Sequence, residues 1–128
     1  QRFIIKYTKA RYNMDPLYHS KSSVSKWGGD VQDYLPIHSW FDETKNGFAY
    51  PVHRAIRHHA EGIGWCIDTF GRKLLLSTGK EIPVRYVAEQ HIMEDFGWIP
   101  NMKDWLKNLK PEPWMLKVSK QPAHRAMG

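Results

Sequence analysis

Two histidine–aspartate pairs with the same spacing are the residues of this sequence best suited to chemistry. His38 and Asp42 form one pair, and His91 and Asp95 form the other. Residues four apart share one face of an α-helix, so each pair can present an imidazole and a carboxylate in the same direction. Such groups can bind a divalent metal ion, or the carboxylate can hydrogen-bond the imidazole and fix its tautomer. The spacing therefore predicts either a metal site or a buried polar network.

A third histidine is predicted to join these pairs. Residues 51–71 have the apolar periodicity of one long helix, and His59 falls in the middle of its apolar stripe. A histidine on that face needs a polar partner. We therefore expect three helices to direct one set of side chains into a shared pocket, with Glu94 beside it. The set is His38, Asp42, His59, His91 and Asp95.

The chemistry of this set is that of a metal centre in a helical bundle. Imidazole nitrogens and carboxylate oxygens suit a divalent ion such as Zn, Mn or Fe. A water molecule activated by the metal would attack a phosphate ester, a nucleotide or an amide. The set predicts a buried His/Asp centre in a protein of unknown activity, with a metal-dependent hydrolase as the first hypothesis and a module that binds a small molecule without turnover as an alternative. Cys66 lies among apolar neighbours, which favours a buried thiol over a nucleophile.

The opposite face of the predicted long helix carries charged groups. Arg54, Arg57, His58 and Glu61 project away from the apolar stripe on an ideal helical wheel. We expect this face to be solvated or to bind a partner.

Both ends of the chain are basic. Residues 1–29 hold six Lys/Arg and one acid, and residues 98–128 hold six and two, whereas residues 30–97 hold seven and ten. Basic ends favour nucleic acid or an acidic protein surface as the partner of a non-enzymatic assembly subunit. Solubilising arms are the alternative. The candidate contacts are Lys6, Lys9, Arg11, Lys117 and Lys120.

Length and composition fit one soluble, mainly α-helical domain over residues 14–116. A basic N-terminal extension, 1–13, and a basic C-terminal tail, 117–128, flank it. We predict a bundle of about four helices, with a β-hairpin near 72–83 and an ordered loop or short helix over 15–29. The helices are predicted near 33–46, 51–70, 84–96 and 102–109, with Asp33 as the N-cap of the first.

The same composition bears on location. A single cysteine cannot form an internal disulfide and fits a reducing compartment, such as the cytoplasm or an organelle matrix. No run approaches the roughly 20 apolar residues of a membrane helix, so no membrane contact is expected.

Several stretches carry a family resemblance. They are DPLYHSKSSVSKWGG, DYLPIHSWFDETK, HRAIRHHAEGI and GKEIPVRYVAEQHIMEDFGWIP, followed by DWL. Together they resemble a group of small uncharacterised bacterial and phage proteins over about Met14 to Trp114, which implies a virion or a phage-infected cell as a further location. A weaker similarity to HD-type metal phosphohydrolases implies a helical site of histidines and aspartates. Their hallmark is an adjacent His-Asp pair, where this chain has His58-His59.

Overall fold

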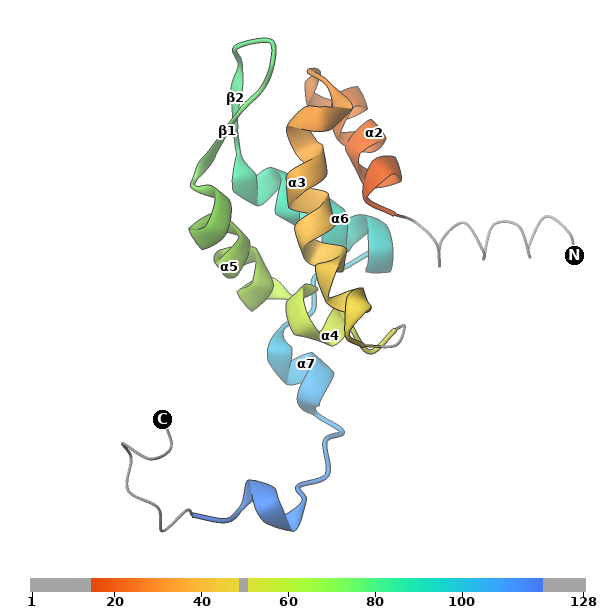
Figure 1. Ribbon diagram of the computed structural model, residues 1–128, viewed down its shortest axis with the longest axis vertical. Helices are drawn as coiled ribbons and strands as arrows, with labels where there is room; N and C mark the ends of the chain where they lie inside the picture. Colours follow the sequence, from red (N-terminus) through yellow and green to blue (C-terminus); the bar gives the residue numbers. More distant parts are fainter. Residues whose placement is uncertain (1–14, 49–50, 119–128) are drawn as a thin grey trace, which may run out of the picture.

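Helices and one short hairpin form the regular structure of residues 15–48 and 51–118, the part of the chain that the computed structural model describes. The predicted mainly α-helical fold with a minor β-hairpin is confirmed (Figure 1). In chain order the elements are α2 (Pro16–Trp27), α3 (Val31–Asp42), η1 (Glu43–Asn46), α4 (Arg54–Arg57), α5 (Ala60–Phe70), β1 (Lys73–Leu75), β2 (Glu81–Pro83), α6 (Val84–Phe96), α7 (Met102–Leu106) and η2 (Pro113–Met115).

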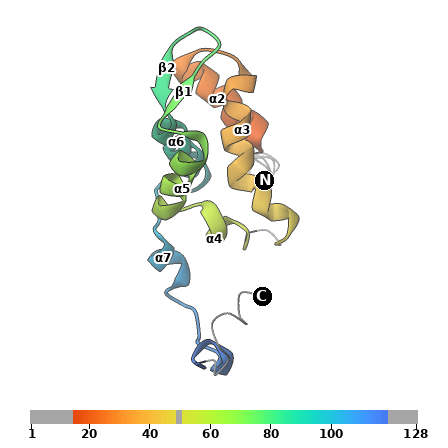
Figure 2. The same ribbon diagram turned by 60° about the vertical axis from the view of Figure 1, so that its left-hand side comes forward.

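Helix α6 is the central element of the bundle, because it contacts α2, α3 and α5. Figures 1 and 2 show α2 and α3 side by side, with α5 packed against another side of α6. The apolar core lies between these helices and the hairpin. Its buried members are Tyr34, Ile37, Phe41, Ile63, Cys66, Leu76, Ile82, Val84, Val87, Ala88 and Ile92. Cys66 is a buried free thiol, as expected, and burial raises its pKa to about 12.

The hairpin confirms the strand pattern predicted at 72–83. Strands β1 and β2 are antiparallel, with Leu74 opposite Ile82, and Gly79 adopts φ +91° in the turn between them. The carboxylate of Asp33 accepts hydrogen bonds from both the backbone N–H and the hydroxyl of Ser77, which ties the turn to α3. Asp33 is therefore not the N-cap of that helix. The N-cap is Asp30, whose N–H donates to Asp33 at 2.8 Å.

Helix α2 is longer than the loop or short helix predicted for residues 15–29. Asp15 caps its start by accepting from the N–H groups of Leu17 and Tyr18. The hydroxyls of Ser20 and Ser23 donate to carbonyl oxygens one turn earlier, so these serines are accommodated inside the helix. The serine-rich composition thus conceals a helix of three turns that brings a buried polar face to the bundle.

The predicted helix over 51–71 is wrong as a single element, because it breaks between His58 and His59. His59 has an extended backbone, φ −160° and ψ 173°, and its Nδ1 accepts from the N–H of Gly62 as the N-cap of α5. The backbone approaches itself closely at this point: a Cβ on Gly62 would lie 1.8 Å from the carbonyl oxygen of Arg57. Position 62 therefore requires glycine. The break also changes the direction in which the side chains of α4 point relative to those of α5.

Residues of helix α7 make hydrogen bonds to the residues on both sides of this break. The indole N–H of Trp105 donates to the carbonyl oxygen of His58 at 3.0 Å, and the carboxylate of Glu61 accepts from the N–H of Met102 at 2.9 Å. Asn101 caps α7, and the helix ends at Leu106, earlier than the predicted residue 109.

Candidate metal centre

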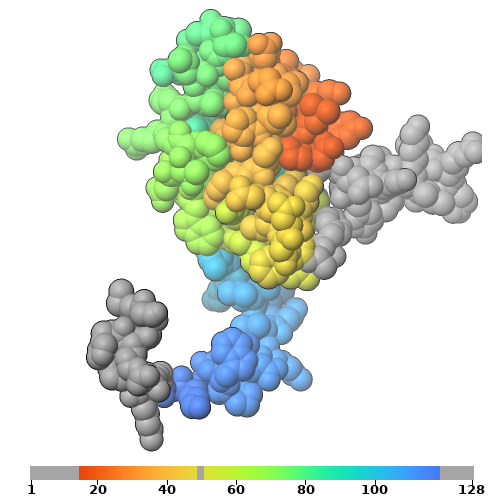
Figure 3. Space-filling model, in the orientation of Figure 1, coloured from red at the N-terminus to blue at the C-terminus, as the bar shows by residue number. Residues whose placement is uncertain are grey.

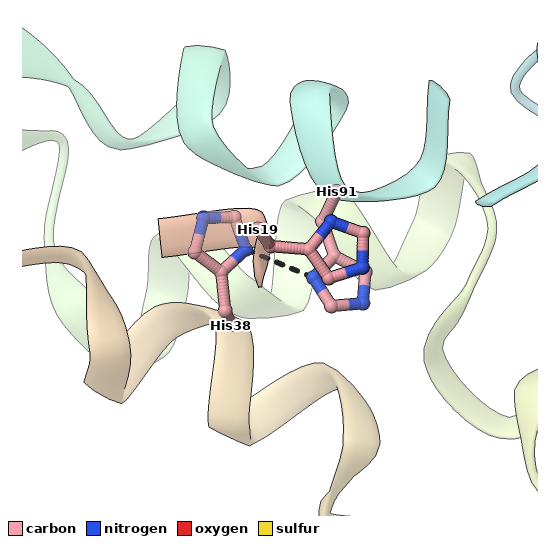
Figure 4. Close-up of side chains that lie close together, drawn as sticks. All are labelled: His19, His38 and His91. Carbon is pink, nitrogen blue, oxygen red and sulfur yellow. Dashed lines mark hydrogen bonds between the residues drawn. The ribbon is translucent and has the colours of Figure 1, made fainter. Parts of the chain in front are cut away.

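Four helical segments bring imidazoles and carboxylates together at the centre of the bundle. α2 provides His19, α3 provides His38 and Asp42, the end of α4 provides His58, and α6 provides His91 and Asp95. The four imidazoles are completely buried. Figure 4 shows three of them, with the rings of His19 and His91 nearly in contact, at 3.9 Å between centroids, and His38 facing both.

Two aspartates and two histidines form the tightest part of this cluster. The Nε2 atom of His58 lies 3.3 Å from Oδ1 of Asp42 and 3.2 Å from Oδ2 of Asp95. The Nε2 atom of His91 lies 3.4 Å from the same two oxygens. A metal ion about 2.1 Å from four tetrahedral ligands holds those ligand atoms about 3.4 Å apart. The spacing of the four side chains therefore fits one ion between them.

Within the described residues, the converging atoms do not make normal hydrogen bonds with one another. The Nε2 atoms of His19, His58 and His91, and Oδ1 of Asp95, are buried without a hydrogen-bond partner. Buried polar atoms are nearly always satisfied in folded proteins, so a group of unsatisfied ones at one point indicates a ligand. A cation would satisfy the Nε2 lone pairs of His58 and His91 and the carboxylate oxygens at the same time.

A second layer of charge surrounds Asp95. Its Oδ1 lies 3.3 Å from Nε2 of His19 and 3.5 Å from the guanidinium of Arg54. Nδ1 of His19 lies 2.8 Å from the carboxylate of Glu94, which also accepts from the hydroxyl of Ser22. His19 is thus held between two carboxylates at the edge of the centre.

The shifted pKa values of two imidazoles and two carboxylates, those of His38, His91, Asp42 and Asp95, follow from this arrangement. Burial lowers the pKa of His38 to about 2 and that of His91 to about 4, and repulsion from neighbouring imidazoles acts in the same direction. Burial alone would raise the pKa of Asp42 and of Asp95, but the imidazoles beside them hold both pKa values well below the ordinary range. At neutral pH the centre offers neutral His38 and His91 with two ionised aspartates.

His19 behaves in the opposite way. Burial lowers its pKa, but the hydrogen bond to Glu94 and the nearby carboxylate charges of Asp95 and Glu94 outweigh burial and raise the pKa to about 9. Burial would raise the pKa of Glu94, but hydrogen bonds from His19, Ser22 and Gln90 hold it below its ordinary value. In the absence of a metal, His19 therefore supplies positive charge next to Asp95.

The structure brings together four of the five predicted centre residues and leaves one out. His38, Asp42, His91 and Asp95 meet as the i, i+4 spacing predicts, and Glu94 lies beside them through its contact with His19. The placement of His59 in the pocket is wrong. Its Nδ1 caps α5, its Nε2 donates to the carbonyl oxygen of Ile56 at 3.0 Å, and it lies outside both groups of potential ligands.

Sequence reasoning missed two members of the cluster, His19 and His58. His58 was assigned to an outer face because the wheel assumed an unbroken helix, whereas it is buried against both aspartates. His19 lies in the segment 15–29, predicted as an ordered loop or short helix, where a surface histidine is the common case. The signal that would have found it is the spacing of His19, Ser20 and Ser23, which marks one polar buried face of α2.

Arg54 and Arg57 do not lie on the solvated outer face that the helical wheel predicts. Arg54 is buried beside Asp95, and Arg57 is half-buried, with its guanidinium donating to the carbonyl oxygen of Trp40 and stacked over that indole. Of the predicted basic contacts at the chain ends, Lys117 is exposed. Lys6, Lys9, Arg11 and Lys120 lie outside the described residues, as do most of the predicted extension and tail.

The sequence belongs to a defined family. Residues 14–115 match the family model described as a domain of unknown function (DUF6915), and the chain is a member of that family. No match was found among curated proteins or among solved structures. In the described part of the chain, no helix has the length and apolar character needed to cross a membrane.

Proposed function

We propose that this protein binds one divalent metal ion at Asp42, His58, His91 and Asp95, and that the ion activates water for hydrolysis of a phosphate ester or nucleotide. The observation that carries the proposal is the unsatisfied state of Nε2 of His58 and His91, which both face the two carboxylates at 3.2–3.4 Å. The donor set of two nitrogens and two oxygens suits Zn, Mn or Fe.

The charge of the centre fits this role. Two ionised aspartates balance a divalent ion, and imidazoles bound to a metal add no further charge. The guanidinium of Arg54 near Asp95 then leaves the surroundings positive, which favours an anionic substrate over a neutral one. The sequence resemblance to HD-type metal phosphohydrolases, which are helical and use histidines and aspartates, would imply the same class of substrate.

The metal would act by lowering the pKa of a bound water from 15.7 to about 7, which supplies hydroxide at neutral pH. A tetrahedral ion with four side-chain ligands has no position for water, so hydrolysis would require the ion to expand to five-coordinate. The side chain of Asp42 is 9% exposed and that of Asp95 is 2% exposed, so a substrate would approach from the side of Asp42.

Metal analysis tests the proposal directly. Protein purified without chelator is expected to hold about one equivalent of Zn, Mn or Fe, and EDTA is expected to lower its melting temperature. Restoring the metal at 100 times its Kd should return about 2.7 kcal/mol of stability. A chain with no stoichiometric metal, whose melting temperature does not respond to any of the three ions, would contradict the metal site. A loaded protein that does not hydrolyse bis(4-nitrophenyl) phosphate or nucleotides would contradict the hydrolase only.

A second candidate function, a non-enzymatic subunit of a larger assembly, rests on the segment that follows α7. Figure 3 shows this segment standing clear of the helical body. Trp114 is 71% exposed and Val118 is 85% exposed, and Lys110 and Lys117 in the same segment are also exposed. Exposed apolar and basic side chains in one segment suit an acidic protein surface or nucleic acid, on which lysines contact phosphates and an indole stacks on bases.

Removal of residues 117–128 together with Trp114→Ala tests this second function. If the chain binds RNA or DNA, the variant should lose at least tenfold in affinity, and the affinity of the intact chain should fall steeply between 50 and 200 mM salt. Metal content of the variant should be unchanged, because the centre lies in the helical body. A weak, salt-independent affinity that the truncation does not alter would remove the nucleic-acid form of this function.

A further inference from the structure

We propose that a hydrogen-bonded chain from Gln90 through Ser23 to His38 fixes the tautomer of His91, so that His38 is a positioning residue and not a metal ligand. This inference rests on the proposed metal site. It matters because the nitrogens of His19, His38 and His91 also lie close enough together to form a second potential metal group. Distances alone do not distinguish the two groups, but donors and acceptors do.

The hydrogen-bonded chain begins at the side-chain amide of Gln90, because only one orientation of this amide suits its neighbours. Its Nε2 lies 2.9 Å from the carbonyl oxygen of His19 and 2.9 Å from Oε1 of Glu94. Both neighbours are acceptors, so the NH2 group must face them. The amide oxygen of Gln90 consequently faces the hydroxyl of Ser23, at 2.5 Å.

The hydroxyl of Ser23 transmits this orientation to His38. A hydroxyl has one proton, and the acceptors next to Ser23 are the amide oxygen of Gln90 and the carbonyl oxygen of His19. Because Ser23 donates that proton to an oxygen, it must accept a hydrogen bond from Nε2 of His38, 2.8 Å away. His38 therefore carries its proton on Nε2, and its Nδ1 is an acceptor.

The last link is the contact between two ring nitrogens. Nδ1 of His38 lies 2.9 Å from Nδ1 of His91, the hydrogen bond drawn in Figure 4. Since Nδ1 of His38 accepts, Nδ1 of His91 donates, and the lone pair of His91 is on Nε2. That nitrogen is the one that faces Asp42 and Asp95 at 3.4 Å. Metal-bound histidines commonly donate their other N–H to a fixed acceptor in this way.

These hydrogen bonds also exclude the group of His19, His38 and His91 as a metal site. Both nitrogens of His38 are engaged, one with Ser23 and one with His91. Nδ1 of His19 is engaged with Glu94 at 2.8 Å. The atoms that remain to coordinate an ion are those around the two aspartates. One metal ion, with His58 and His91 as its nitrogen ligands, is the arrangement that this network supports.

The experiment uses the intact chain loaded with 113Cd and labelled with 15N at histidine. Cadmium–nitrogen coupling is expected at Nε2 of His58 and of His91, and at neither nitrogen of His38. Coupling to His38, or coordination of His91 through Nδ1, would overturn the inference while leaving a metal site in place. Failure to bind cadmium, zinc or manganese at all would instead remove the proposed function, and this inference with it.

A matched pair of serine variants tests the hydrogen bonds that link Gln90, Ser23 and His38. Ser23→Ala breaks the link to His38 and is expected to weaken metal binding by about 10- to 100-fold, the usual effect of losing such a partner. Ser20→Ala removes a buried hydroxyl from the same helix, one that donates to the carbonyl oxygen of Pro16 and has no part in the chain. Its Kd for zinc should stay within about twofold of the intact protein. Equal affinities for the two variants would overturn the positioning role of His38.

Discussion

Replacing Asp95 by Asn is expected to reduce metal affinity by at least 100-fold and to lower the stability of the metal-free protein by about 3–5 kcal/mol. The carboxylate is nearly buried and faces His19, His58, His91 and Arg54 at 3.2–3.5 Å. The amide keeps the shape but removes the charge, so the ion loses a ligand and Arg54 loses its buried counter-charge. Zinc titration and urea unfolding in EDTA measure the two effects separately.

Asp68→Asn is the matched control for this variant. Asp68 is an exposed aspartate on α5, on a face away from the centre, so the same chemical change should leave zinc affinity and stability within about 0.5 kcal/mol of the intact protein. Retention of full zinc affinity by Asp95→Asn would show that Asp95 is not a ligand. A loss confined to stability, with no change in zinc affinity, would mean that the aspartate acts only as a structural counter-charge.

The predicted side chains that meet in the structure are those whose common direction depends on local geometry alone. His38 with Asp42, and His91 with Asp95, lie within unbroken helices, so the four-residue spacing determines their common direction. The hairpin and α6 were predictable for the same reason, because strand propensity, Gly79 and Gly97 act within a few residues.

The errors occur where a contact distant in sequence decides the local structure. The apolar period over 51–71 favours one helix, but Trp105 binds the carbonyl oxygen of His58, and Ala60 N–H donates to the carbonyl oxygen of Pro100. These contacts stabilise a break that no helical wheel contains. The break exchanges the roles of two adjacent histidines: His58 enters the centre and His59 becomes a cap.

Helix α2 illustrates a second limit. Serine is neutral in helix interiors and common in loops, because its hydroxyl competes for backbone groups. Here Ser23 has partners from three elements: the carbonyl oxygen of His19 in its own helix, His38 in α3 and Gln90 in α6. The buried polar face of α2 has a favourable energy only because these partners exist, and nothing local to residues 15–29 reveals them.

The centre also predicts that the metal-free protein is most stable near pH 6.5–7 and loses stability on both sides. The pKa values of His38 and His91 lie far below the ordinary value of 6.5, at about 2 and about 4. Near pH 5 the unfolded chain therefore binds about two more protons at these two positions than the native chain. Stability should fall by about 1.4 kcal/mol per pH unit for each proton, or about 2.7 kcal/mol per unit in total. Below pH 4 the depressed pKa values of Asp42 and Asp95 add to the loss.

On the alkaline side the sign reverses because of His19. Its pKa is raised from 6.5 to about 9 by Asp95 and Glu94 against the effect of burial, so the native chain holds a proton that the unfolded chain has released. The stabilisation is complete below pH 6.5 and is lost as pH rises to about 9, at about 1.4 kcal/mol per pH unit. Urea unfolding in EDTA from pH 4.5 to 9 measures both limbs. His19→Gln should abolish the alkaline limb and preserve the acidic limb, since the glutamine has no proton to lose. An alkaline limb that persists in His19→Gln would assign that proton to a different group and would contradict the charge arrangement around Asp95.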